Sequence, residues 1–137
     1  MLFILTIFAV LSAGTAFFNQ NTEPIVLSPE VTAFLKGVIE ECIEETGVVP
    51  NILELLKADN YVADDKNKSF LACGYRKAGA LDSEGKLHPH KIASYFPDEL
   101  NVLEYFQKCN KHEDEVKETA YQSYECTKVT LPYHILI

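Results

Sequence analysis

The sequence predicts an all-α domain of about six short helices, crosslinked by two disulfides. Apolar residues recur at helical spacing in one segment after another, and no strand-like alternation persists anywhere in the chain. The 137 residues suit a single domain, and 47% hydrophobic with 23% charged residues is the composition of a packed globular chain. Four cysteines are spread over the sequence.

The first two helices are predicted from clear start and stop signals. Ser28 is a typical N-cap, and the proline and glutamate that follow it favour the first turn of a helix. Apolar residues then recur at helical spacing from Val31 to Ile43, and Gly47 ends the segment. A second, short helix follows Pro50, with leucine and isoleucine residues on its buried side.

A polar loop over residues 59–68 separates these helices from the third, which runs through Phe70 and Tyr75 and ends at Gly79. Gly74 inside this helix costs about 1 kcal/mol relative to alanine. We therefore expect it to allow the close approach of a neighbouring helix.

Prolines mark the next helix boundaries. A fourth helix begins at Pro89 and runs through Phe96, and a fifth begins in segment 97–99 and ends near Cys109. A sixth helix covers about residues 113–128, with valine, alanine and tyrosine residues on its inner face.

The N-terminus predicts a secretory signal peptide over residues 1–16, followed by a mature helical domain over residues 17–137. Residues 2–11 form an almost unbroken apolar run, much shorter than the roughly 20 residues of a membrane span. Gly14 and Ala16 then supply small residues at the positions that define a cleavage site. No lysine or arginine precedes the run, so a buried N-terminal helix of a cytosolic protein remains the alternative. The first interpretation makes the protein secreted and extracellular.

Charge and the reactive residues exclude several functions. A formal net charge of −8 disfavours nucleic acid and anionic lipid as partners. His88-Pro89-His90 has no third ligand at a suitable spacing, so the sequence predicts no metal and no cofactor. It also contains no G-x-S-x-G motif and no other nucleophile–base pattern, so we do not expect an enzyme.

The cysteines are Cys42, Cys73, Cys109 and Cys126, and an even number in a secreted chain predicts two disulfides. None lies in a C-x-x-C pair, which argues against a zinc ribbon or a thioredoxin-type redox site. Three pairings are open, and spacing alone does not choose among them.

The C-terminal residues 131–137 are apolar, although chain ends are usually polar and frayed. Two interpretations of the tail are compatible with each other. It packs as a strap over the core, and it forms one wall or lid of an internal cavity. His134 lies within it, and histidines titrate near pH 6.5. If the tail closes a pocket, protonation of His134 is one way to loosen it.

One segment carries a family resemblance: Cys73-Gly-Tyr-Arg-Lys-Ala-Gly-Ala-Leu-Asp-Ser-Glu-Gly-Lys-Leu87. With the cysteine layout, helix count and signal peptide, it resembles the insect odorant-binding proteins of the pheromone and general odorant-binding superfamily. Most members have six cysteines, and Ser69 and Lys117 stand where the second and fifth would be. This paired absence is similar to the four-cysteine "C-minus" subgroup. The family's pairing order implies Cys42–Cys73 and Cys109–Cys126, with more motion where the missing bridge would join the third and sixth helices.

The resemblance implies a carrier that holds a small hydrophobic molecule, such as an odorant, a pheromone or a similar lipid-like compound, in a central apolar pocket. A membrane receptor is a second partner class that it allows. The rival interpretation is a secreted helical protein with a filled core that acts by binding a protein or a membrane. The candidate residues of the pocket wall are Leu35, Val38, Ile39, Leu56, Leu71, Tyr75, Ile92, Phe96, Leu103, Phe106, Tyr121, Tyr124, Tyr133 and Ile135.

Overall fold

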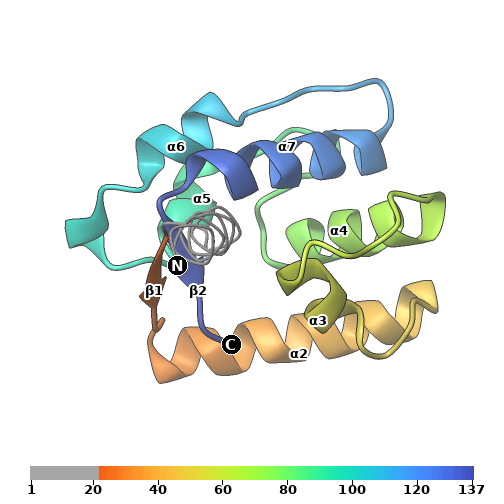
Figure 1. The fold of residues 1–137 in the computed structure, drawn as a ribbon. Coiled ribbons are helices and arrows are strands. Elements are labelled where there is room, and N and C mark those ends of the chain that lie inside the picture. Colours follow the sequence, from red (N-terminus) through yellow and green to blue (C-terminus); the bar gives the residue numbers. More distant parts are fainter. Residues whose placement is uncertain (1–21) are drawn as a thin grey trace, which may run out of the picture.

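The computed structural model describes residues 22–137, so the predicted signal peptide lies outside the described residues. Within that range the chain forms six α-helices, one short 3-10 helix and two short strands (Figure 1), which confirms the predicted all-α class. In order, the elements are β1 (Glu23–Ile25), α2 (Pro29–Thr46), α3 (Ile52–Lys57), α4 (Asp65–Lys77), α5 (Pro89–Ala93), η1 (Asp98–Leu100), α6 (Leu103–Lys108), α7 (Val116–Thr130) and β2 (Tyr133–Ile135).

Helix α2 begins and ends where the sequence predicts. The Ser28 hydroxyl accepts the backbone N–H of Val31 at 3.2 Å, and proline occupies the first turn. Gly47 adopts a left-handed conformation with φ of 69° and donates its N–H to the Ile43 carbonyl, which ends the helix.

Helix α4 begins earlier than predicted, because part of the expected loop over residues 59–68 is helical. The Asp64 carboxylate accepts the N–H of Asn67 at 2.8 Å and so caps the first turn. Gly79, with φ of 76°, follows the helix as expected. The Asp64 cap stabilises a first turn that has no apolar residues, so the apolar pattern of the sequence did not reveal this turn.

The predicted fourth and fifth helices are shorter than expected. Helix α5 ends at Ala93, before Tyr95 and Phe96, and the predicted fifth helix is split into η1 and α6. The break falls at Asn101, whose φ of 50° lies in the left-handed region and cannot continue a right-handed helix.

Two strands were not predicted. β1 and β2 pair in parallel, with Glu23 opposite Tyr133 and Ile25 opposite Ile135. Strands of three residues are too short to show an alternating pattern in the sequence. The pair joins the segment before α2 to the segment after α7 (Figure 1), and so brings distant parts of the chain together.

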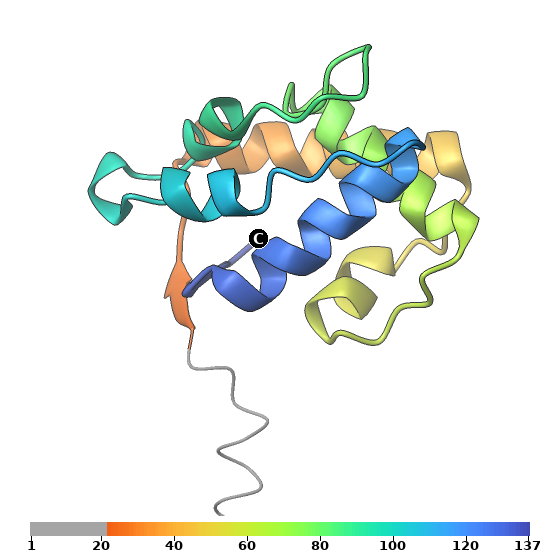
Figure 2. The ribbon, with the colours of Figure 1, turned by 90° about the horizontal axis from the view of Figure 1, so that it is seen from above.

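Both disulfides have the pairing that the resemblance implied. Cys42–Cys73 joins α2 to α4, and Cys109–Cys126 joins the end of α6 to α7. Helix α4 packs against both α2 and α7. In Figure 1, α2 and α7 lie at the bottom and top of the molecule, and Figure 2 shows that they cross at an angle.

Gly74 differs from expectation, because a Cβ added there would have no other atom within 4 Å. The glycine therefore admits no close neighbour. We expect Gly74→Ala to raise the free energy of unfolding by about 1 kcal/mol, since alanine suits a helix interior better. Thermal denaturation measures this effect.

A matched control is Gly79→Ala, which we expect to be destabilising. At Gly79 the backbone φ is 76°, and an added Cβ would lie 3.1 Å from the Lys91 side chain. A Gly74→Ala protein that melts at or below the wild-type temperature would contradict the first expectation.

Candidate functional site

The predicted wall residues are all buried or half-buried, and they gather in two apolar clusters. The first cluster, formed around α2, α3, α4 and α7, contains Val38, Ile39, Leu56, Leu71, Tyr75, Tyr121 and Tyr124. The second cluster, around the start of α2, α5, α6 and the C-terminal tail, contains Leu35, Ile92, Phe96, Phe106, Tyr133 and Ile135. Leu103 is half-buried but belongs to neither cluster.

The two clusters follow one another along the same two helices. On α2, Leu35 packs in the second cluster, and Val38, one turn further on, lies in the first. On α7, Ala120 is wholly buried in the first cluster, and Leu131, just after the helix, is buried in the second. The apolar interior therefore continues from α4 toward the tail, and it changes cluster midway along α2 and near the C-terminal end of α7.

The C-terminal tail packs as a strap over the second cluster. Tyr133 and Ile135 are inward positions of β2, whereas the intervening His134 is exposed. The His134 ring nitrogen Nδ1 lies 2.9 Å from the Thr22 hydroxyl, and Lys57 donates to the carbonyl of Ile137 at 2.7 Å. His134 therefore lies on the outer side of the strap.

A polar group at the edge of the first cluster was missed by the sequence analysis, because Tyr61 lay in a predicted loop. Its ring meets Tyr124 edge to face, with 6.1 Å between centroids, and its hydroxyl donates to Glu125. Burial, together with the Glu125 carboxylate, raises the pKa of Tyr61 above its usual range. Lys128 pairs with Asp59 at 2.6 Å and lies 5.7 Å from each of the two ring centroids.

A second missed feature is a row of hydroxyl residues on the inner face of α7. Thr119 is wholly buried and Ser123 is 3% exposed. The Thr119 hydroxyl accepts the Glu113 N–H at 2.9 Å and donates to the carbonyl of the same residue at 3.3 Å. The signal in the sequence is the spacing of four residues, which places Thr119, Ser123 and Thr127 on one helix face.

Two open surface depressions lie among the described residues, and neither contains a predicted wall residue. The larger, of about 510 Å³, has charged side chains at its edge and is lined by Glu45, Thr46, Ser69, Ala72, Cys73, Arg76, Glu115, Val116 and Lys117. The smaller, of about 310 Å³, is lined by Lys86, Leu87, Asn110, Lys111 and His112. Both have charged side chains at their edges, but Ala72 and Cys73 of the first cluster form part of the larger depression and Leu87 of that cluster forms part of the smaller.

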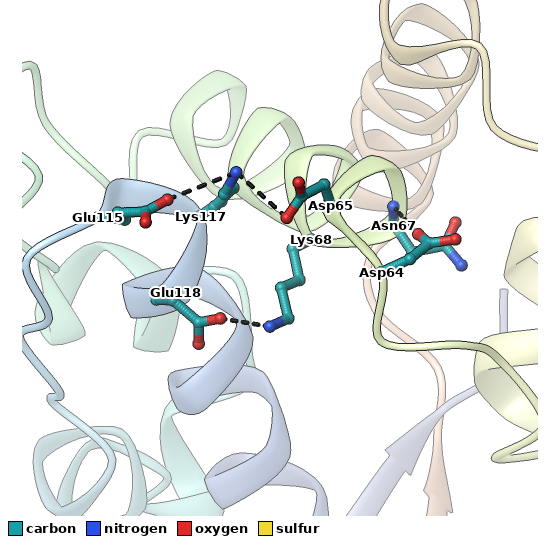
Figure 3. A network of polar contacts seen from close by, with 7 residues as sticks. All are labelled: Asp64, Asp65, Asn67, Lys68, Glu115, Lys117 and Glu118. Atoms are coloured by element: carbon teal, nitrogen blue, oxygen red, sulfur yellow. Dashed lines mark hydrogen bonds and ion pairs between the residues drawn. The ribbon is translucent and has the colours of Figure 1, made fainter.

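Ser69 and Lys117, which the resemblance places at the missing bridge, line the larger depression together. Lys117 reaches Asp65 at 3.3 Å and Glu115 at 3.4 Å, and these two carboxylates raise the pKa of Lys117. Between α4 and α7, Lys68 forms an ion pair with Glu118, the residue that follows Lys117 (Figure 3). Ionic contacts therefore join α4 to α7 where a disulfide is absent.

Within residues 22–137, no three His, Cys, Asp or Glu side chains are grouped to hold a metal ion. His88, from the His88-Pro89-His90 motif, instead lies 2.8 Å from the Asp82 carboxylate. None of the helices described is long and apolar enough to span a bilayer.

The architecture thus defines a small, disulfide-linked helical protein with a tyrosine-rich apolar interior. The chain belongs to the PBP/GOBP family, whose model matches residues 26–129. With four cysteines in two disulfides, it fits the C-minus subgroup.

Solved structures show the same fold. The chain is similar to an odorant-binding protein of the medfly, at 25% identity and a TM-score of 0.61, over 72% of this chain and 88% of that one. It is also similar to an odorant-binding protein of Locusta migratoria, at 26% identity and a TM-score of 0.66, over 79% of this chain and 87% of that one. No curated protein sequence matches the chain.

Proposed function

We propose that this protein is a secreted, non-enzymatic carrier that binds one small hydrophobic molecule between its two apolar clusters. The observation that carries the proposal is the gathering of buried aromatic and aliphatic residues along α2 and α7, in a chain that belongs to the PBP/GOBP family. The structurally similar medfly and locust proteins are odorant-binding proteins, which supports a ligand of the same kind. Secretion rests on the predicted signal peptide over residues 1–16, which would leave a mature domain over residues 17–137.

The energetics of such binding are favourable. Transfer of an apolar chain from water yields roughly 0.8 kcal/mol per buried CH₂, so ten to fifteen carbons supply on the order of 8–12 kcal/mol. Association and ordering oppose this gain. Micromolar affinity corresponds to about −8 kcal/mol, so it requires a ligand at the upper end of this range whose binding costs little ordering of the protein.

The wall residues are proposed to contact the ligand directly. In the second cluster, Tyr133 and Ile135 belong to the tail and pack against the other wall residues. These two tail residues would therefore form one side of the bound site. The tail would thus serve as both strap and wall.

Displacement of the fluorescent probe N-phenyl-1-naphthylamine tests the proposal. We expect saturable probe binding at one site per chain, and competition by medium-chain alcohols. Binding that never saturates, or none at all, would contradict the proposal and favour the rival protein with a filled core.

Two adjacent variants locate the site, because α2 presents Leu35 to the second cluster whereas the neighbouring Phe34 is 44% exposed. Leu35→Trp should weaken probe binding about tenfold by filling the interior, since added volume in a packed site forces rearrangement. Phe34→Trp should leave the affinity unchanged. Equal effects of both variants would place the probe elsewhere.

A further inference from the structure

One buried polar atom on α7 has no partner in the described part of the chain. The hydroxyl oxygen of Thr127 is inaccessible to solvent and makes no hydrogen bond with any described residue. Buried polar groups are nearly always paired, and leaving one unpaired is unfavourable. An unpaired buried hydroxyl within residues 22–137 of a protein that we propose to be a ligand carrier therefore calls for a functional explanation.

The other polar groups on the same face of α7 are satisfied. Thr119 exchanges two hydrogen bonds with the Glu113 backbone. Burial raises the pKa of Tyr75 and the nearby Ser123 hydroxyl opposes that shift, so Ser123 has a polar group within reach and is not among the unpaired atoms. Thr127 is thus the exception in a row of three hydroxyl residues.

The position of Thr127 is also distinctive. One turn before it lies Ser123, beside Tyr124 of the first cluster, and one turn after it lies Leu131 of the second cluster. Thr127 therefore occupies the junction at which the apolar interior changes from one cluster to the other. Its unpaired hydroxyl is therefore available for a hydrogen bond at this junction.

We infer that Thr127 is the hydrogen-bonding point for the ligand, which therefore carries a neutral hydroxyl or carbonyl oxygen on an apolar chain. This inference rests on the proposed carrier function. A charged ligand group is disfavoured, because burial of an unpaired charge is far more costly than burial of a hydroxyl. Lys128, the adjacent cation, is already paired with Asp59 and Glu125 at the edge of the first cluster.

The test compares 1-octanol with 1-chlorooctane, which has similar shape but no hydroxyl group. Thr127→Val keeps the side-chain shape and removes the hydroxyl. It should weaken 1-octanol binding about tenfold, equivalent to about 1.4 kcal/mol, and leave 1-chlorooctane binding within twofold. Thr127→Ser should retain most of the affinity for 1-octanol.

A second readout needs no ligand. Removing an unsatisfied hydroxyl should raise the melting temperature of ligand-free Thr127→Val by a few degrees. The matched control is Thr119→Val, which should lower the melting temperature because it leaves the Glu113 N–H and carbonyl without their partner. An unchanged or lower melting temperature for Thr127→Val would overturn the claim that its hydroxyl is unsatisfied.

The outcomes separate this inference from the proposed function. If wild type binds both octyl compounds and Thr127→Val weakens both equally or neither, Thr127 is not the hydrogen-bonding point, and the carrier function stands. If wild type binds neither 1-octanol, 1-chlorooctane nor the fluorescent probe, the carrier function itself fails.

Discussion

Replacing Cys42 and Cys73 together by alanine is expected to lower the free energy of unfolding by about 4 kcal/mol. The bridge closes a loop with a sequence separation of 31 residues, and its loss restores that loop's freedom to the unfolded chain. A domain of this size has a net stability of about 5–15 kcal/mol, so the variant should approach the limit of folding. Denaturation in urea, with the remaining bridge oxidised, measures the loss.

The second native bridge provides the comparison. Cys109–Cys126 closes a shorter loop, with a separation of 17 residues, and the corresponding double alanine variant should lose about 3 kcal/mol. Cys42, Cys73 and Cys109 are wholly or almost wholly buried and Cys126 is half-buried, so alanine also leaves small voids at both bridges. A larger loss for the 109–126 variant than for the 42–73 variant would contradict the loop-entropy explanation.

Introducing a third disulfide should raise the free energy of unfolding by about as much as the removal of a native disulfide lowers it. Ser69→Cys with Lys117→Cys places thiols at the two positions that we expect to correspond to the second and fifth cysteines of six-cysteine relatives, and both positions line one depression beside α4 and α7. Joining them would constrain a loop of roughly 48 residues, for which the entropy estimate is about 4 kcal/mol before any strain. We expect the oxidised double variant to gain about 2–4 kcal/mol.

The control for this variant is Lys117→Ala, which removes the ion pairs with Asp65 and Glu115 without adding a bridge. These partners are exposed, so the change should lower the stability only slightly, and the loss should shrink further in high salt. Peptide mapping of the double variant under non-reducing conditions must find all three expected bridges. Failure of residues 69 and 117 to pair would show that they are not equivalent to the family's second and fifth cysteines.

The helix boundaries show where sequence reasoning succeeds. Helix α2 was predictable because its cap, proline and terminal glycine act locally, within one turn of the residue that each controls. The break at Asn101 was not, since asparagine adopts a left-handed conformation only when the surrounding structure requires it. The parallel pairing of β1 and β2 depends on contacts across nearly the whole chain, which periodicity cannot reveal.

Some features of the candidate site could likewise be predicted from the sequence, and others could not. Helical periodicity identified Val38 and Leu71 as inward-facing, and the structure confirms their burial. The disulfide pairing needed the family resemblance, because three pairings suit the spacing equally. The contrast between Thr119 and Thr127 was inaccessible from sequence, since the same residue type on the same helix face differs only in whether a backbone group happens to lie within reach.

The most direct test of an interior binding site is a crystal structure with 8-bromo-1-octanol, in which the anomalous signal of bromine locates the chain end of the ligand. We predict one bromine peak within the apolar interior between α2 and α7, with the ligand oxygen within hydrogen-bonding distance of the Thr127 hydroxyl. Bromine found only in the surface depression beside Ser69 and Lys117, or only on the outer surface, would contradict the account.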